Sequence, residues 1–217
     1  MSLYNDKYVD EGTRLVIWKI EEDPDWFLSQ LSLDEEELRR YDGFRTDQRR
    51  LHWLAYRHIL KNVIKKGQEI RVRYDQSNKP FIDLSNDHIS VSHSGNFAVA
   101  IISSKHVVGV DVEEVADRLK KVSDKFLGEH ESGDTPRNLP IEKLCLYWCA
   151  KEAIYKAHGE RMLDFRNHIR IGRIPERLEG HFRGSVCREE IDKHYNLVAE
   201  RLENYFLVYV TGALTTE

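Results

Sequence analysis

Residues 108–114 have the sequence VGVDVEE, in which apolar and acidic residues alternate. Side chains on a β-strand alternate between two faces, so Val110 and Val112 are expected to point into a core while Asp111 and Glu113 share the other face. Two adjacent carboxylates repel each other unless a cation lies between them, and Mg²⁺ is bound by carboxylates, phosphate oxygens and water. Spacing alone favours a strand end that exposes two acids to solvent. The metal site is therefore a hypothesis that needs support from the rest of the chain.

A downstream helix supplies that support. Residues 141–158 have the pattern of a strong helix, and they contain the segment WCAKEAIYKA at 148–157. Glu152 and Lys156 are four residues apart on one face, with Trp148 one turn earlier. Taken alone, such an i,i+4 ion pair is common on helix surfaces and contributes little. Taken with the acidic strand, it offers a third carboxylate and a lysine to a metal-bound diphosphate.

Segments upstream carry groups that suit phosphate. The run Ser92-His93-Ser94-Gly95 stands at a strand end and combines hydroxyl and imidazole donors with a closely approaching backbone. A single histidine, however, is more often a turn residue whose hydrogen bonds are made within the protein. Lys79 lies in a tight turn before Pro80. Further cations line an expected helix and suit an additional phosphate, namely Arg49, Arg50 and Arg57.

The remaining patterns predict alternating strands and helices. Strands are expected at 13–20, 70–74, 79–83, 88–92, 97–103, 107–113, 168–174, 181–187, 194–200 and 205–212, with 97–103 and 107–113 forming a hairpin. A long helix is expected to about residue 66, with Ser32 as its N-cap and a break near Gly43, and another helix at 118–127. Residues 133–140 are expected to form a loop. The order predicts an α+β fold with two halves of similar layout.

Composition limits the class of protein. The chain has 217 residues, 41% of them hydrophobic and 32% charged, so a sizeable core is expected, and a net charge of −4 does not suggest a nucleic-acid binder. The apolar runs are far shorter than the roughly 20 residues that span a bilayer, and no secretory signal is visible. Three sparse cysteines, Cys145, Cys149 and Cys187, fit a reducing cytoplasm better than a zinc site.

Positive charge is concentrated in one region. Residues 39–79 hold twelve Lys or Arg against four Asp or Glu, a local charge of +8, which leaves −12 for the rest of a chain whose total is −4. Such a region either attracts polyanions, including an acidic protein partner, or forms an evenly solvated face. Charge density alone does not decide between the two.

The motifs resemble those of the 4′-phosphopantetheinyl transferase superfamily, in its larger, two-halved Sfp-type branch. The resemblance rests on GVDVE at 109–113 and on Trp148-x-x-Lys151-Glu152-Ala153-x-x-Lys156. Lys79-Pro80 and Ser92-His93-Ser94 precede them in the expected order, and Glu131 fills an intermediate acidic position. The similarity covers about residues 79–157. It implies two pseudo-symmetric α+β halves, residues 1–104 and 105–217, with coenzyme A in the cleft between them, and it favours a monomer.

The same resemblance implies roles for individual residues. Asp111, Glu113 and Glu152 would hold Mg²⁺, with Mn²⁺ as an alternative. Lys156 would contact the phosphates, and Glu131, or Glu129 in the same segment, would be the general base. The remaining contacts to coenzyme A would come from Lys79, Ser92, His93, Arg49, Arg50, Arg57 and Lys151.

The implied reaction moves phosphopantetheine from coenzyme A to a serine of an acyl or peptidyl carrier protein, in fatty acid, polyketide or nonribosomal peptide synthesis. The carrier serine attacks the β-phosphate and 3′,5′-ADP leaves. Two alternatives stay open. One is a magnesium-dependent phosphohydrolase that uses the same carboxylates on a water molecule, and the other is a non-catalytic homologue that binds coenzyme A.

Overall fold

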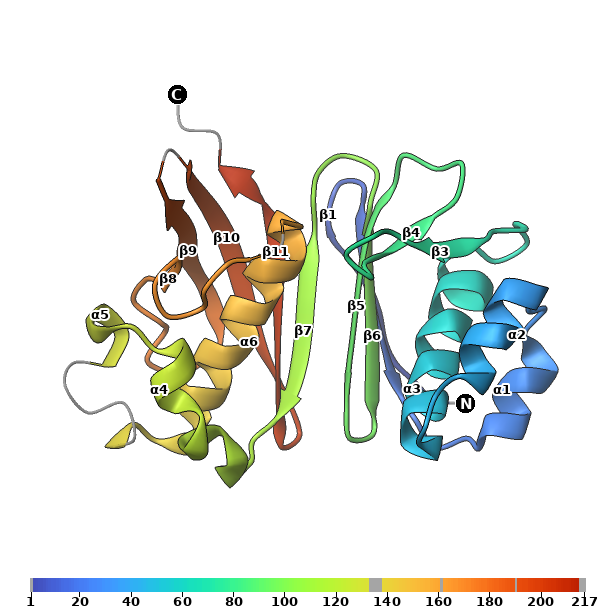
Figure 1. The fold of residues 1–217 in the computed structure, drawn as a ribbon, viewed down its shortest axis with the longest axis horizontal. Helices are drawn as coiled ribbons and strands as arrows, with labels where there is room; N and C mark the ends of the chain where they lie inside the picture. Colours follow the sequence, from blue (N-terminus) through green and yellow to red (C-terminus); the bar gives the residue numbers. More distant parts are fainter. Residues whose placement is uncertain (1, 133–137, 161, 190, 215–217) are drawn as a thin grey trace.

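Two antiparallel sheets form the centre of the molecule (Figure 1). The computed structural model describes residues 2–132, 138–160, 162–189 and 191–214. The first sheet has the order β1 (Leu3–Asp10), β2 (Thr13–Lys19), β6 (Phe97–Ser103), β5 (His88–Ser94). The second has the order β7 (Gly109–Glu114), β11 (Tyr205–Leu214), β10 (Ile191–Leu202), β9 (Gly180–Arg188), β8 (Ile169–Ile171). A short hairpin of β3 (Val72–Tyr74) and β4 (Pro80–Ile82) stands apart.

Helices cover the outer faces of both sheets (Figure 1). On the first sheet they are α1 (Pro24–Gln30), α2 (Glu35–Asp42) and α3 (Asp47–His58), which continues into a π-helical turn at Ile59–Ile64. On the second they are α6 (Ile141–His158), a 3₁₀ turn at Asp117–Lys121, α4 (Ser123–Phe126) and α5 (Glu129–Ser132). The α+β class expected from the sequence is confirmed. No helix in the described ranges is long and apolar enough to cross a membrane.

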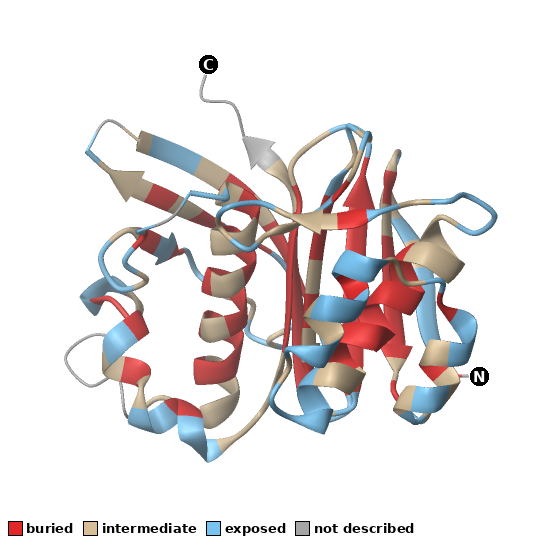
Figure 2. Cartoon of the chain, turned by 45° about the vertical axis from the view of Figure 1, so that its right-hand side comes forward, coloured by how far each residue is buried: buried red, intermediate tan, exposed pale blue. Residues whose placement is uncertain are grey.

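Three layers of apolar side chains hold the sheets and helices together. Strand β6 contributes to two of them, because Ala98 and Ala100 face the helices while Phe97 and Val99 face the second sheet. Both faces of β6 are therefore buried, which explains its unbroken apolar sequence. The third layer lies between α6 and the outer face of the second sheet. Figure 2 shows the buried residues concentrated on the central strands and on the inner side of α6.

Serine hydroxyls join the two sheets along the neighbouring strands β5 and β7. Each hydroxyl accepts a hydrogen bond from a backbone N–H of β7 at 3.1–3.2 Å, in the pairs Ser90–Val110, Ser92–Val112 and Ser94–Glu114. The partners in each pair are 20 residues apart, so the two strands run in the same direction. These N–H groups face away from β11, and the hydroxyls satisfy them where no backbone ladder does. We call this row of contacts the serine seam.

The expected hairpin between residues 97–103 and 107–113 is wrong. Strand β6 pairs with β2 and β5, whereas β7 pairs with β11 in the other sheet. The connection between them is tied down elsewhere, because Lys105 forms an ion pair with Glu11 and His106 contacts Asp10. These contacts hold the connection against the turn between β1 and β2, so the chain crosses from one sheet to the other there. The division at residues 104 and 105 stays a prediction.

Other boundaries shift for local reasons. The N-cap of α2 is Asp34 and not Ser32, and Asp34 forms a reciprocal capping box with Glu37. The same spacing occurs at both positions, and Asp34 prevails because its carboxylate also forms an ion pair with Arg73. The break at Gly43 is present, since this glycine ends α2. Strand β1 and helix α1 were not expected, although Asp23 followed by Pro24 is a recognisable start signal for α1.

Two of the remaining expectations can be placed in the structure, and most of a third cannot. The helix expected at 141–158 has those bounds. The helix expected at 118–127 is divided between a 3₁₀ turn and α4. Residues 133–137 of the expected loop lie outside the described residues.

Helix α6 lies directly against β7 at Gly109. A Cβ atom at this position would overlap the carbonyl oxygen of Ala153 and lie 2.9 Å from the Cβ of Ala157. Backbone atoms of a packed helix cannot move aside cheaply. The glycine in front of Asp111 therefore sets how closely α6, and with it Glu152, approaches the acidic strand.

We expect Gly109→Ala to lower the free energy of unfolding by about 1–3 kcal/mol, the usual cost of overpacking. Gly43→Ala is the matched control, because its Cβ would meet only ordinary contacts at 3.4 Å. Urea denaturation of both variants measures the difference. Equal midpoints for Gly109→Ala and the wild type would show that α6 can retreat without cost.

Candidate functional site

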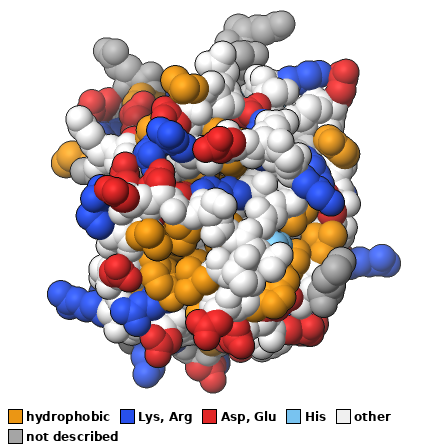
Figure 3. Space-filling model, turned by 90° about the vertical axis from the view of Figure 1, so that its right-hand side faces the viewer, with side chains coloured by type: hydrophobic (Ala, Val, Ile, Leu, Met, Phe, Trp, Pro, Cys, Tyr) orange, Lys and Arg blue, Asp and Glu red, His pale blue; other side chains and the backbone are white. Residues whose placement is uncertain are grey.

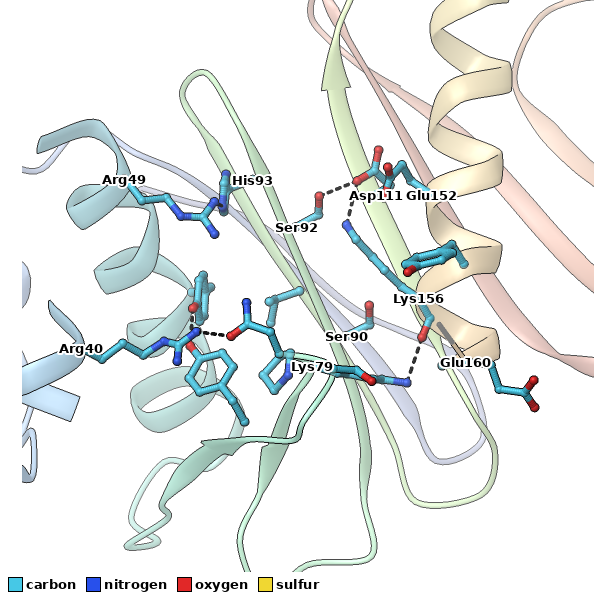
Figure 4. A pocket seen from close by; sticks show the side chains of 18 of the residues that line it. Arg40, Arg49, Lys79, Ser90, Ser92, His93, Asp111, Glu152, Lys156 and Glu160 are labelled. Atoms are coloured by element: carbon cyan, nitrogen blue, oxygen red, sulfur yellow. Dashed lines mark hydrogen bonds and ion pairs between the residues drawn. The ribbon is translucent and has the colours of Figure 1, made fainter. Parts of the chain in front are cut away.

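A cavity of about 390 Å³ lies between the serine seam, α6 and the helices of the first sheet (Figure 4). Its walls come from α2, α3, the β3–β4 hairpin, β5, β7 and the end of α6. The cavity has an acidic end at Asp111 and Glu152, and an end with cationic and aromatic side chains at Arg40, Arg49 and Tyr74. Residues predicted from separate motifs are thus brought together here.

Asp111 is held in one orientation at the acidic end. Its Oδ1 atom accepts hydrogen bonds from the hydroxyl of Ser92 at 2.7 Å and from Nζ of Lys156 at 2.8 Å. Lys156 also donates to the carbonyl oxygen of Val110 at 3.0 Å. The Oδ2 atom of Asp111 is buried and has no hydrogen-bond partner among the residues that the structure describes. Because a buried carboxylate oxygen without a partner is costly, this atom is an open position for a ligand.

Two further carboxylates lie near Asp111. Burial, followed by the charges of Asp111 and Glu113, raises the pKa of Glu152 to about 7, while Lys156 opposes this shift. Burial and Asp111 also raise the pKa of Glu113, against the effect of Arg118, with which Glu113 forms an ion pair. Burial and the neighbouring negative charges therefore disfavour the charged forms of Glu113 and Glu152.

The acidic end has the chemistry of a site for a hard cation. Within the described ranges, no three His, Cys, Asp or Glu side chains are already gathered into a metal site. The Oδ2 atom of Asp111 nevertheless remains buried without a partner, and Glu113 and Glu152 lie near it with pKa values that burial raises. Oxygen ligands of this kind suit Mg²⁺. The residues fit the ion, although Glu113 would have to exchange Arg118 for it.

His93 is electrically neutral at the other end of the cavity. Burial is the main cause that lowers its pKa to about 3, and the neighbouring His52, Arg49 and Lys156 add to the effect. The ring stacks on His52 with centroids 4.4 Å apart, and its Nε2 lies 2.8 Å from Nη1 of Arg49. A neutral ring accepts this hydrogen bond, so Arg49 keeps its charge available to the cavity.

The sequence motifs did not identify Arg40. Its guanidinium lies 3.4 Å from the ring centroid of Tyr74 and donates to Oδ1 of Asn78 at 2.5 Å. Both partners also line the cavity. A planar cation on an aromatic ring suits a base or a phosphate. The only sequence signal was its place in the basic region, which twelve cations share. Lys79, which was predicted, lines the same wall and donates to the carbonyl oxygen of Lys156 at 2.8 Å.

Two predicted residues form a structural ion pair and do not line the cavity. The carboxylate of Glu131 lies 2.7 Å from Nζ of Lys151, and both side chains are fully buried. Glu131 also accepts hydrogen bonds from the backbone of Gly128 and Ile171, and Lys151 donates to the carbonyl oxygen of Ile169. These contacts do not suit a general base or a ligand of coenzyme A. The structure thus places Glu131 and Lys151 away from the cavity, and their predicted roles in catalysis and binding are not carried into the proposal below.

Three other assignments change. Arg57 is buried and bonded to Glu37 and to the carbonyl of Val72, so it belongs to the core. Arg50 forms an ion pair with Asp47 and does not line the cavity. Ser92 lines the cavity, but its hydroxyl donates to Asp111 and is not free to donate to a phosphate.

The basic region is partly neutralised by acids that lie elsewhere in the sequence. Arg73 forms ion pairs with Asp34 and Glu36, Lys61 with Glu37, and Lys65 with Asp87. All four acids stand outside residues 39–79. Figure 3 accordingly shows cationic and anionic side chains interspersed around a hydrophobic area on the face that it displays. The excess positive charge of residues 39–79 therefore does not form a continuous basic surface on the face shown in Figure 3.

Comparisons with known proteins point to one enzyme family. Residues 107–210 match the family model described as the 4′-phosphopantetheinyl transferase superfamily. The chain is 28% identical over 112 residues to the 4′-phosphopantetheinyl transferase gsp of Aneurinibacillus migulanus, covering 50% of this chain and 46% of that protein. It is 25% identical over 147 residues to the 4′-phosphopantetheinyl transferase ffp of Bacillus subtilis, covering 64% of this chain and 65% of that protein.

Fold and site together define an α+β protein with a cavity that suits a nucleotide diphosphate and a cation. The comparisons confirm the resemblance drawn from the motifs, because residues 107–210 match the model of the 4′-phosphopantetheinyl transferase superfamily and both relatives carry that name. The matched region includes the acidic strand β7 and the whole of α6. The chain spans about half of the first relative and just under two thirds of the second.

We expect the neutral state of His93 to make the free protein acid-sensitive. In the unfolded chain this ring takes up a proton below about pH 6.5, whereas in the fold its pKa is about 3. This contribution to stability is therefore complete above pH 6.5 and declines as pH falls toward 3. In NMR spectra its ring signals should not shift between about pH 8 and pH 5. A His93 midpoint near pH 6.5 would contradict this result.

We expect Lys151→Met to lower the free energy of unfolding by about 3–5 kcal/mol, because it leaves the buried carboxylate of Glu131 without a counter-charge. The double variant Lys151→Met/Glu131→Gln should recover part of this loss. Glu176→Gln breaks the exposed pair with Arg173 and should change stability by less than about 0.5 kcal/mol. Denaturant unfolding of the four proteins checks the assignment. If Glu131→Gln removed activity without lowering stability, the corrected role of Glu131 would be wrong.

Proposed function

We propose that the protein transfers the 4′-phosphopantetheine moiety of coenzyme A to a serine of an apo acyl or peptidyl carrier protein. The observation that carries this proposal is the geometry of Asp111, which has one oxygen fixed by Ser92 and Lys156 and the other oxygen bare and buried. This carboxylate stands at one end of a cavity whose other end is cationic and aromatic. The named relatives and the family match support the same reaction class.

The acidic end would hold the cation. Asp111, Glu113 and Glu152 supply oxygen ligands, and Mg²⁺, or Mn²⁺ in its place, would neutralise the diphosphate of coenzyme A and the charge that develops during transfer. Lys156 donates a hydrogen bond to the carboxylate of Asp111 and lines the cavity. Its ammonium group would turn to the diphosphate oxygens and stabilise the leaving phosphate.

The opposite end would hold the nucleotide. Arg40 on Tyr74 offers a planar cation and an aromatic wall, while Arg49 and Lys79 offer charge to the additional phosphate of coenzyme A. Neutral His93 orients Arg49 by accepting its hydrogen bond. Burial lowers the pKa of Lys79, so this lysine gains from an anionic partner.

The reaction follows from these positions. The hydroxyl of the carrier serine attacks the β-phosphorus of coenzyme A and gives up its proton to solvent. The bond between that phosphorus and the bridging oxygen breaks, and 3′,5′-ADP leaves with the electron pair of that bond. Reactions of this kind need mainly positioning and charge stabilisation. With Glu131 buried in its ion pair, the proposal assigns it no part in the transfer.

The proposal also covers partners and setting. We infer two halves, 1–104 and 105–217, acting as a monomer, because the acidic strand and the cationic end of the cavity come from one chain. The three cysteines are free, which supports a reducing cytoplasm. A carrier protein is the expected macromolecular partner, with no nucleic acid or membrane involved.

Intact-mass spectrometry of apo carrier proteins tests the function. With coenzyme A and Mg²⁺, we expect a carrier to gain the mass of one phosphopantetheine, and a chelator should stop the gain. Asp111→Asn keeps the size of the side chain but weakens the cation site, and should slow transfer by about 10²–10³-fold, as for other lost electrostatic groups. The control Asp117→Asn removes an exposed carboxylate next to Lys120 and should transfer normally.

Other outcomes of the same assay separate the alternatives. Coenzyme A consumed without any change in carrier mass would indicate a phosphohydrolase. Coenzyme A bound but unchanged, with every carrier unmodified, would indicate a binding protein. Rapid transfer by Asp111→Asn in magnesium buffer would contradict the role given to Asp111.

A further inference from the structure

The hydroxyl of Ser92 makes two contacts that serve different parts of the molecule. It accepts a hydrogen bond from the backbone N–H of Val112 at 3.2 Å, and it donates its hydrogen to Oδ1 of Asp111 at 2.7 Å (Figure 4). Ser92 is only 6% exposed, so water competes little for these contacts. One atom thus joins the two sheets and holds the carboxylate of the acidic end.

The neighbouring serines show that this arrangement is particular to Ser92. Ser90 accepts from the N–H of Val110 in the same way, and within the described ranges it contacts no carboxylate of the acidic end. Ser94 accepts from the N–H of Glu114 and reaches Glu113 only at 3.5 Å. The three hydroxyls share the seam, but only Ser92 makes a short hydrogen bond to Asp111.

The carboxylate of Asp111 is polarised by this contact. Ser92 and Lys156 both donate to Oδ1, and a carboxylate oxygen has about two lone pairs to offer. Oδ1 is therefore saturated, and the remaining capacity of the group lies on the buried Oδ2. In the proposed function Lys156 turns to the diphosphate, and Ser92 then remains the one described side chain that keeps Oδ1 in place.

We propose that Ser92 is a positioning residue that fixes Asp111 so that its Oδ2 atom faces the cation. Because the same hydroxyl belongs to the serine seam, Ser92 couples cation binding to the hydrogen bonds of that seam. The inference rests on the proposed function for the identity of the site as a divalent-cation site. Coupling of this kind is reciprocal, so a bound cation should strengthen the seam as much as the seam strengthens cation binding. The role originally expected for Ser92, a direct contact to coenzyme A, is replaced by this one.

The test compares Ser92→Ala with Ser90→Ala, measured without carrier protein. Both variants remove one hydroxyl from the seam and should lower the unfolding temperature. Mn²⁺, counted as free ion by electron paramagnetic resonance, should bind Ser92→Ala about tenfold more weakly than the wild type, the lower end of the effect of losing an outer partner of a metal ligand. Ser90→Ala should keep the wild-type affinity. Ser92→Thr retains the hydroxyl and should restore much of the binding.

Thermal unfolding across a Mg²⁺ titration supplies a second readout. The ion should raise the unfolding temperature of the wild type and of Ser90→Ala, and raise that of Ser92→Ala markedly less. Equal Mn²⁺ affinity in Ser92→Ala and Ser90→Ala would overturn the proposal, as would a wild type that binds no Mn²⁺. If the wild type binds Mn²⁺ in the expected order of variants but modifies no carrier, the coupling stands and the proposed function fails.

Discussion

The serine seam joins the two sheets through side-chain hydroxyls, where a ladder of backbone hydrogen bonds would otherwise be expected. Strands β5 and β7 run side by side in the same direction, yet the N–H groups of β7 bond to serine oxygens. A hydroxyl placed between two backbones holds them farther apart than a direct N–H to carbonyl bond does. The cavity opens along this joint, with Ser92 and His93 on one side and Asp111 on the other. The residues of the site are therefore aligned by the same contacts that hold the sheets together.

Sequence patterns predicted the parts of the site that follow a simple period. Alternation on β7 separates Asp111 and Glu113 from Val110 and Val112, and these two valines do lie in the core. Helical spacing places Glu152 and Lys156 on one face of α6, and both line the cavity. Such predictions succeed because strand and helix geometry fix the direction of a side chain once the element is known.

The predictions that failed concern burial and ion pairing, which the periodic spacing of residues along the sequence does not reveal. Lys151 is adjacent to Glu152 in the motif, but one residue along a helix turns the side chain by about 100°, so it faces the interior and meets Glu131. Arg57 and Arg50 were equivalent candidates in the sequence. Only the fold shows that Arg57 is buried against Glu37, whereas Arg50 forms a local i,i+3 ion pair with Asp47. The charge count over residues 39–79 could not decide between a basic surface and a solvated face, since acids that pair with these cations lie elsewhere in the chain.

The pairing of β7 with β11 has a consequence for how the molecule is made. The acidic strand leaves the ribosome early, but the strand that completes its backbone hydrogen bonds comprises Tyr205–Leu214. Chains are synthesised from the N-terminus, and until residues 205–210 emerge, one edge of β7 has unsatisfied backbone groups. A growing chain can form the first sheet with its helices and still lack a rigid acidic end. Truncated or stalled products should therefore be inactive and prone to aggregate, even though every predicted site residue has already been made.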